Sequence, residues 1–262
     1  MAGCTSPNGC AYVFGRARSG AWSQVQELEI PASAQLHWFG QAVAVDGGTL
    51  VVSAPDEPGT NSDGVVYVFG FSGGLWVEQQ RLTASDPSPW SHFGEAVSLD
   101  GTTLVVSADL EDPSGAAYVF EQAGDTWVER QRLLPSDPDS ATAFGTGVAV
   151  DGDLLLVSDP RADGPGYESG VVHSFSRSGE QWTEAQRVTA HDATDFGYFG
   201  GSMSLLGTTL FVYGNGAVYV FEREDGSWQY AYFQENPNPD ERDNEATNRG
   251  LVRCNRMILE TA

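Results

Sequence analysis

Acidic side chains are the residues of this chain with the most evident capacity for chemistry. The sequence has 36 aspartates and glutamates against 13 basic residues, and every basic residue is an arginine. Two polar stretches, PDEPGTNSD from Pro55 and DPRADG from Asp159, could contribute carboxylate ligands to a hard cation such as calcium. We take Asp56, Asp63, Asp159 and Asp163 as candidate metal ligands, although each stretch alone also fits a solvated loop.

Aromatic residues in polar stretches form the second set of candidates. An acidic surface studded with aromatic rings suits a cationic protein, a calcium-bridged ligand or a carbohydrate. The alternative for each ring is packing against a neighbouring strand. The predicted ligand-binding residues are Trp38, Trp90, His92, Tyr167 and Tyr198.

Catalytic motifs are missing from the sequence. It contains no G-x-S-x-G, no H-E-x-x-H and no phosphate-binding loop, and no cysteine has an evident activating partner. We therefore predict no catalytic residue and no enzymatic activity. A carbohydrate-active enzyme, a glycosidase or polysaccharide lyase using loop carboxylates, is the alternative.

An internal repeat must position these candidates. Phe-Gly pairs begin at Phe39, Phe93, Phe144 and Phe199, at intervals of roughly 50 residues. Each pair opens a phrase such as FGQAVAVDGGTLVVSA, and a second phrase such as GVVYVF follows it. The second phrase also occurs near the N-terminus, as GCAYVF from Gly9, without a Phe-Gly phrase before it. The second phrase of the repeat therefore occurs five times in the chain, and the first phrase occurs four times.

Each unit predicts four short antiparallel strands. Small residues fill the first strand, the second and third are almost wholly apolar, and the fourth alternates polar with apolar residues. A D-G turn such as Asp46-Gly47 joins the first two strands. This gradient, crowded inside and polar at the rim, is typical of a β-propeller blade, so we expect an all-β propeller of four-stranded blades. The Phe-Gly phenylalanines and the fourth-strand tryptophans are assigned to packing.

The repeated unit resembles the bacterial FG-GAP repeat, which is similar to the blades of the integrin α-subunit propeller. The resemblance covers nearly the whole chain except its tail. Integrin-type blades hold calcium in a D-x-D-x-D-G loop, but the corresponding connections here, such as VDGGTL, are too short to wrap an ion. We interpret Asp46, Asp100 and Asp151 as turn formers, and we expect no required cofactor, with calcium possible elsewhere. The resemblance implies a binding or cell-adhesion module, with a protein or carbohydrate ligand on the face formed by the connections between strands two and three and between blades.

The chain termini leave two alternatives for the ring. The tail RGLVRCNRMILETA, from Arg249, offers two strands that would complete the N-terminal half-unit and close a ring of five blades. Alternatively, the chain is a fragment of a seven-bladed ring, the usual number for the family that it resembles. We place the units near 9–30, 39–84, 93–134, 144–190 and 199–233, followed by an acidic linker at 234–248 and the possible closing strands at 249–262.

Charge and hydropathy exclude some partners. A formal net charge of -23 argues against nucleic acids and anionic membranes, since phosphate groups would be repelled. No apolar run reaches the roughly 18 residues that cross a membrane, and the chain shows no signal peptide. By family resemblance we nevertheless expect a secreted or cell-surface location. The three cysteines, Cys4, Cys10 and Cys254, permit one disulfide and do not decide the compartment.

Overall fold

The fold is all-β, as the sequence predicts. The structure, a computed structural model, describes residues 9–30, 38–55, 64–86, 88, 91–111, 114–137 and 143–235. These residues form one two-stranded sheet and four four-stranded sheets, and every strand pairs antiparallel with its neighbours in chain order. The predicted closing strands at 249–262 lie outside the described residues.

Each sheet is one blade, numbered here from first to fifth along the chain. The first blade has β1 (Ala11–Arg16) and β2 (Trp22–Leu28). The second has β3 (Val43–Asp46), β4 (Thr49–Ala54), β5 (Val65–Ser72) and β6 (Leu75–Leu82). The third has β7 (Val97–Asp100), β8 (Thr103–Ala108), β9 (Ala116–Ala123) and β10 (Thr126–Leu133). The fourth has β11 (Gly147–Asp151), β12 (Leu154–Asp159), β13 (Val171–Ser178) and β14 (Gln181–Val188). The fifth has β15 (Ser202–Leu206), β16 (Thr209–Gly214), β17 (Ala217–Glu224) and β18 (Ser227–Glu235).

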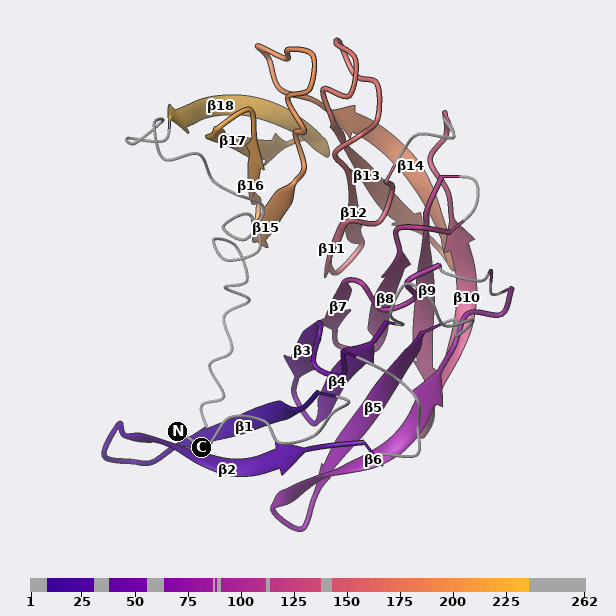
Figure 1. Ribbon diagram of the computed structural model, residues 1–262, viewed down its shortest axis with the longest axis vertical. Coiled ribbons are helices and arrows are strands. Elements are labelled where there is room, and N and C mark those ends of the chain that lie inside the picture. The colour runs from indigo at the N-terminus through magenta and orange to yellow at the C-terminus, as the bar shows by residue number, and fades with distance from the viewer. Residues whose placement is uncertain are drawn as a thin grey trace.

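The blades stand side by side along an arc (Figure 1). The short strands β3, β7, β11 and β15 lie on its inner side, where successive inner strands contact one another, and β6, β10, β14 and β18 lie on its outer side. This is the radial arrangement of propeller blades. The inner strands line a hollow of about 240 Å³.

The hydrophobic core is divided among the spaces between blades. Four clusters of buried side chains occur in the described residues, one between each pair of successive blades. On β4, for example, Val51 packs toward the third blade, whereas Leu50 and Val52 pack toward the first. The second and third strands of a blade are therefore covered on both faces, which explains their continuous apolar sequences.

The Phe-Gly pair is part of the contact between blades. Its phenylalanine is buried and meets the ring of the third strand of its own blade edge-on, with centroids 5.1–5.4 Å apart; these ring pairs are Phe39–Tyr67, Phe93–Tyr118, Phe144–His173 and Phe199–Tyr219. The backbone of the same phenylalanine contacts the glycine that precedes the third strand of the previous blade. For the last two blades, Phe199 N–H donates to Ser169 O at 2.9 Å, directly beside Gly170.

The short hairpin turn between the first and second strands differs in detail from the D-G turn expected from the sequence. Asp46 is still the last residue of β3, and Gly47 and Gly48 form the turn. Of these two, only Gly47 has positive φ, 52°, as in a type II′ turn. The Asp46 carboxylate instead accepts the Gly101 N–H of the next blade at 2.7 Å. Asp100 accepts the Gly152 N–H in the same way, also at 2.7 Å.

Candidate ligand-binding face

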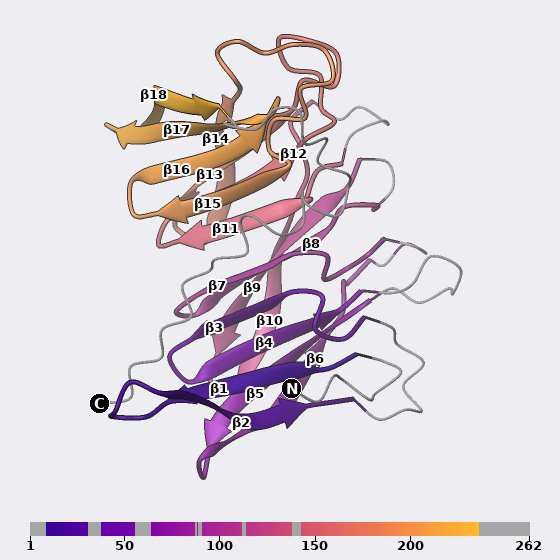
Figure 2. The ribbon, with the colours of Figure 1, turned by 60° about the vertical axis from the view of Figure 1, so that its left-hand side comes forward.

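The long connections of the propeller gather on one side of the arc. The hairpin turns between first and second strands lie on the opposite side (Figure 2). Seven residues other than glycine have positive φ among those described, and all except Asp225 belong to the long-connection side: Trp38, His92, Glu168, Phe196, Tyr198 and Asn215. Positive φ is uncommon for large side chains and costs free energy, so backbone strain is concentrated on this face.

Three exposed aromatic rings come together where the fourth blade meets the fifth. Tyr167 belongs to the β12–β13 loop, and Phe196 and Tyr198 belong to the β14–β15 loop. The Tyr167 and Phe196 rings are 5.3 Å apart at a steep 77°, and the Phe196 and Tyr198 rings are 6.4 Å apart at 50°. The three side chains, here called the aromatic trio, are 53%, 56% and 43% exposed respectively. Exposed aromatic rings that are grouped in this way make a candidate contact site.

Hydrogen bonds join the two loops that carry the aromatic trio. The Asp195 carboxylate accepts the Tyr167 N–H at 2.9 Å, and the Phe196 N–H donates to Tyr167 O at 2.8 Å. The Tyr198 N–H donates to Glu168 O at 3.3 Å. These bonds join a loop of the fourth blade to the connection between the fourth and fifth blades, so the relative position of the rings depends on how these two blades stack.

The surroundings of the aromatic trio are mainly negative. Partial burial raises the pKa of the Tyr198 hydroxyl, and a hydrogen bond to Glu168 with the charge of that carboxylate raises it further. Arg161 acts in the opposite direction on the same hydroxyl. The Asp163 carboxylate lies beside Glu168 and accepts its N–H at 2.8 Å.

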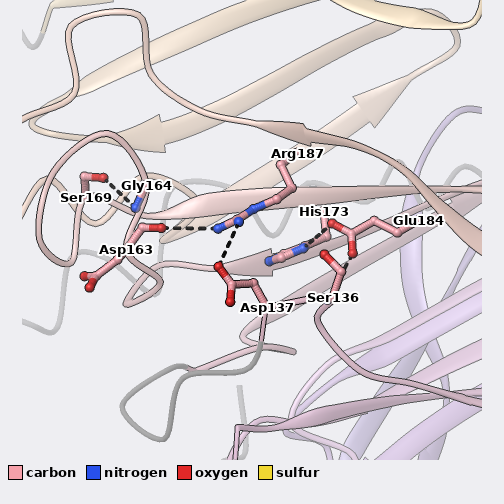
Figure 3. Close-up of polar contacts among 8 residues, drawn as sticks. All are labelled: Ser136, Asp137, Asp163, Gly164, Ser169, His173, Glu184 and Arg187. Carbon is pink, nitrogen blue, oxygen red and sulfur yellow. Dashed lines mark hydrogen bonds and ion pairs between the residues drawn. The ribbon is translucent and has the colours of Figure 1, made fainter.

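Polar contacts that include the buried His173 lie near the base of the β12–β13 loop (Figure 3). His173 on β13 lies 2.8 Å, Nδ1 to Oε1, from Glu184 on β14, and the second carboxylate oxygen of Glu184 accepts the Ser136 N–H at 3.1 Å. Burial alone would raise the pKa of Glu184, but the hydrogen bonds from His173 and Ser136 outweigh it and lower the pKa. Arg187, also on β14, donates to Asp163 O at 3.2 Å and lies 3.5 Å from the Asp137 carboxylate.

The candidate metal ligands do not form a metal site in the described part of the chain. Asp159 is fully buried, and its carboxylate accepts the Ala143 N–H at 2.9 Å, while Asp163 is exposed on the loop surface. No group of three His, Cys, Asp or Glu side chains that could hold a metal ion occurs among the residues described. Asp56 and Asp63 lie outside them.

The candidate aromatic residues divide among different blade junctions. Tyr167 and Tyr198 meet through Phe196, as described above. Trp38 and His92 occupy the same place as Tyr198, directly before a Phe-Gly pair, but at earlier junctions. His92 Nδ1 lies 3.4 Å from the Asp109 carboxylate, and Trp38 is 40% exposed. Trp90 lies outside the described residues.

Sequence reasoning missed Phe196, and it placed Asp159 among candidate metal ligands on a loop although this carboxylate is buried at the end of β12. Phe196-Gly197 is a second Phe-Gly pair immediately before Phe199-Gly200, in DFGYFG, and this departure from the repeat is a usable signal. Asp159 stands where the second and third blades have the buried alanines Ala54 and Ala108. Aligning the repeats would therefore have marked the fourth blade as unusual.

Comparison with known protein families agrees with the repeat. The model of the FG-GAP repeat matches residues 22–69, 76–120 and 127–175, which together make up more than half of the chain. This chain belongs to the FG-GAP repeat family. Each matched stretch of this FG-GAP repeat protein begins at an outer-strand tryptophan and ends on the third strand of the next blade. The sequence repeat thus straddles two structural blades.

Similarity to solved structures supports the fold of this FG-GAP repeat protein and nothing more. A protein of unknown function from Desulfotomaculum acetoxidans matches with a TM-score of 0.61 at 11% identity, covering 88% of this chain and 65% of its own. A candidate 6-phosphogluconolactonase from Bacteroides fragilis matches with a TM-score of 0.57 at 14% identity, covering 86% of this chain and 63% of its own. The chain thus spans less than two thirds of each of these structures. No curated protein matches it.

The described residues contain no helix with the length and apolar character to cross a membrane.

Proposed function

We propose that this FG-GAP repeat protein is a non-catalytic binding or adhesion module whose ligand, a protein or a carbohydrate, binds on the face of the long connections. The support comes from the fifth blade. There β16 and β17 are joined by Asn215 and Gly216 alone, whereas in the fourth blade residues 160–170 join the corresponding strands, β12 and β13. A blade therefore folds without a long loop, and the additional residues of the fourth blade are available for a ligand.

The backbone of the long connections supports the same proposal. Trp38, Phe196 and Tyr198 place large aromatic side chains on positive-φ backbone and leave them substantially exposed. Neither the strain nor the exposure stabilises the fold, and such features persist where a contact with another molecule makes use of them.

Binding and turnover should be measured together. The intact chain would be screened against immobilised glycans and proteins, and each retained ligand would also be assayed for product release. We expect retention without product. Turnover that disappears when one loop carboxylate is changed to its amide would instead establish the enzyme.

The face itself is tested by exchanging connections. A chain in which an Asn-Gly turn replaces residues 160–170 should lose binding to the ligand found in the screen. If that variant does not fold, the substitutions Tyr167→Ser and Tyr198→Ser test the same surface. An altered turn at Gly73 and Gly74, on the opposite side, is the matched control and should bind normally. Equal binding by all of these variants would contradict the proposed face.

No cofactor is required by this proposal. The carboxylates of Asp46 and Asp100 already accept backbone N–H groups in the turns where integrin-type blades hold calcium. We expect EDTA to leave the melting temperature and ligand binding unchanged, as measured by differential scanning fluorimetry. A rise in melting temperature with added calcium would contradict this expectation.

We also propose an extracellular or cell-surface location. Cys10 is disulfide-bonded, and disulfides persist in oxidising compartments. Protease treatment of intact cells that express the protein should digest it. Protection until the cells are lysed would contradict the proposed location.

A further inference from the structure

The three rings of the aromatic trio are inclined to one another and do not form a single flat surface. Its rings meet at 77° and 50°, so no one plane contains all three faces. A sugar ring stacks best with its apolar face on one broad, open aromatic face, whereas a compact cation needs only to lie within about 6 Å of an exposed ring face and tolerates rings inclined to one another. The geometry favours the second kind of ligand.

The backbone positions that carry the trio are unusual. Phe196 has φ of 59° and Tyr198 has φ of 48°, and Glu168, which follows Tyr167, has φ of 45°. The hydrogen bonds from the Tyr167 N–H to the Asp195 carboxylate and from the Phe196 N–H to Tyr167 O hold the two loops together in this conformation. The rings are therefore presented by a fixed backbone, which reduces the entropy lost on binding.

Charge at this place is complementary to a cation. The two loops that carry the trio, residues 160–170 and 189–201, contain four acidic residues and one arginine, Arg161. Glu168 and Asp195 contact the backbone or the hydroxyl groups of the trio. The whole chain, at a net charge of -23, attracts basic partners over longer distances.

We propose that the aromatic trio binds a lysine or arginine side chain of a basic protein segment, with the cation against the exposed ring faces and Glu168 and Asp195 beside it. This inference rests on the proposed binding function and adds the chemistry of the ligand. The protein already uses the same interaction internally, since Arg81 lies over the Tyr67 ring at 5.1 Å. Three rings are too few for a whole protein interface but sufficient for one anchoring side chain.

The ligand chemistry is tested with short peptides added to the intact, isotope-labelled protein. The probes are a glycine-lysine peptide, the same peptide with trimethyllysine, and the same peptide with glutamine, beside a neutral oligosaccharide. We expect both charged peptides to shift the amide resonances of residues 166–168 and 195–198, and the glutamine peptide and the sugar to leave them in place. Affinity for the charged peptides should fall as salt is raised to about 0.5 M.

The residues are tested by variants that remove one ring at a time. Phe196→Leu and Tyr198→Leu should each weaken binding of the trimethyllysine peptide about two- to fivefold, because each removes one exposed cation–π contact. Tyr198→Phe keeps the ring and should bind like the parent. Phe71→Leu removes an equally exposed ring at the far end of β5 and should have no effect. Melting temperatures identify any variant that fails to fold, and the peptide series on the unaltered protein remains decisive in that case.

The outcomes separate this inference from the proposed function. Oligosaccharide binding at the trio that is insensitive to salt would overturn the cation proposal and leave the binding module intact. Binding of the charged peptides at other long connections, with no shift of the amide resonances at the trio, would also overturn the cation proposal and leave the binding module intact. Absence of any ligand on this face, in the peptide series and in the wider screen, would overturn both.

Discussion

Single glutamine side chains join each blade to the next. The side-chain amide of an outer-strand glutamine donates to the carbonyl and accepts the N–H of the tryptophan in the following blade, at 2.7–3.1 Å. The four pairs are Gln26–Trp76, Gln80–Trp127, Gln131–Trp182 and Gln186–Trp228. An amide is needed because it alone combines a donor with an acceptor in this geometry.

Removing one of these glutamines should weaken the contact between two blades. Gln131→Ala leaves the N–H and carbonyl of Trp182 without their partners, and we expect the free energy of unfolding to fall by about 1–3 kcal/mol. The carboxylate of Gln131→Glu has no N–H to donate to Trp182 O, so this variant should be no more stable than Gln131→Ala. Gln181→Ala, at an exposed position, is the control and should change stability by less than about 0.5 kcal/mol. Denaturant unfolding measures all three, and equal values would show that the glutamine is dispensable.

Two carboxyl groups of the fourth blade, Asp159 and Glu184, should give opposite pH dependences. Burial raises the pKa of Asp159, although the N–H groups of Ala143, Arg161 and Ala162 and the charge of His173 partly offset it. The folded protein therefore binds this proton more tightly than the unfolded chain, and Asp159 lowers stability as pH rises through its folded pKa. The uncharged Asp159→Asn variant should gain stability relative to the parent between acidic and neutral pH.

Glu184 provides the internal comparison. Its pKa is lowered overall, so its contribution to stability is present at neutral pH and is lost as pH falls through the folded pKa. Glu184→Gln should therefore lose most stability at neutral pH and least in acid. Melting temperatures of both variants across this range are the measurement, and parallel curves would contradict the two assignments.

Among the structural elements, the loop that enters the third strand shows why the repeat keeps a glycine there. Gly170 has φ of 86°, and a Cβ at this position would collide with the backbone of Phe199 in the next blade. The same arrangement occurs where Gly9, Gly64 and Gly115 meet Phe39, Phe93 and Phe144. One glycine thus permits both the turn and the close approach of two blades.

A methyl group at this position should be far more harmful than one in an open turn. Gly179, between β13 and β14, also has positive φ, 65°, but a Cβ there would meet nothing within 4 Å. We expect Gly179→Ala to cost about 1–2 kcal/mol, from backbone strain alone. Gly170→Ala should cost at least about 2 kcal/mol more, because the blades must also move apart. Equal losses in chemical denaturation would show that the close approach is not essential.

At the scale of the whole molecule, each blade is stabilised by its neighbours. Trp76, Trp127, Trp182 and Trp228 are buried against the preceding blade, whereas Trp22 of the first blade is 48% exposed. The first blade also lacks two inner strands among the described residues, and an apolar hollow of about 240 Å³ lies between it and the second blade. Stability in such an array is a sum of contacts between neighbours, so its ends are the weakest places.

The prediction that residues 249–262 close the ring can be tested at this hollow. If they supply the inner strands of the first blade, deleting them exposes its apolar lining and should lower the melting temperature by more than about 2 °C. A chain in which the same residues are shuffled is the matched control and should behave like the deletion. An unchanged melting temperature in the deleted chain would exclude closure and favour a fragment of a larger ring.

The local sequence was sufficient to predict four-stranded propeller blades. The alternation of apolar residues, the turn glycines and the repeat period each depend on residues close together in the chain. The burial of the Phe-Gly phenylalanines and of four outer-strand tryptophans followed from the same pattern. The meeting of Tyr167 with Phe196, the burial of the Asp159 carboxylate, and the pairing of Gln131 with Trp182 were decided only by the tertiary structure. These contacts join residues of different blades or loops, and the stacking of one blade on the next determines which side chains meet.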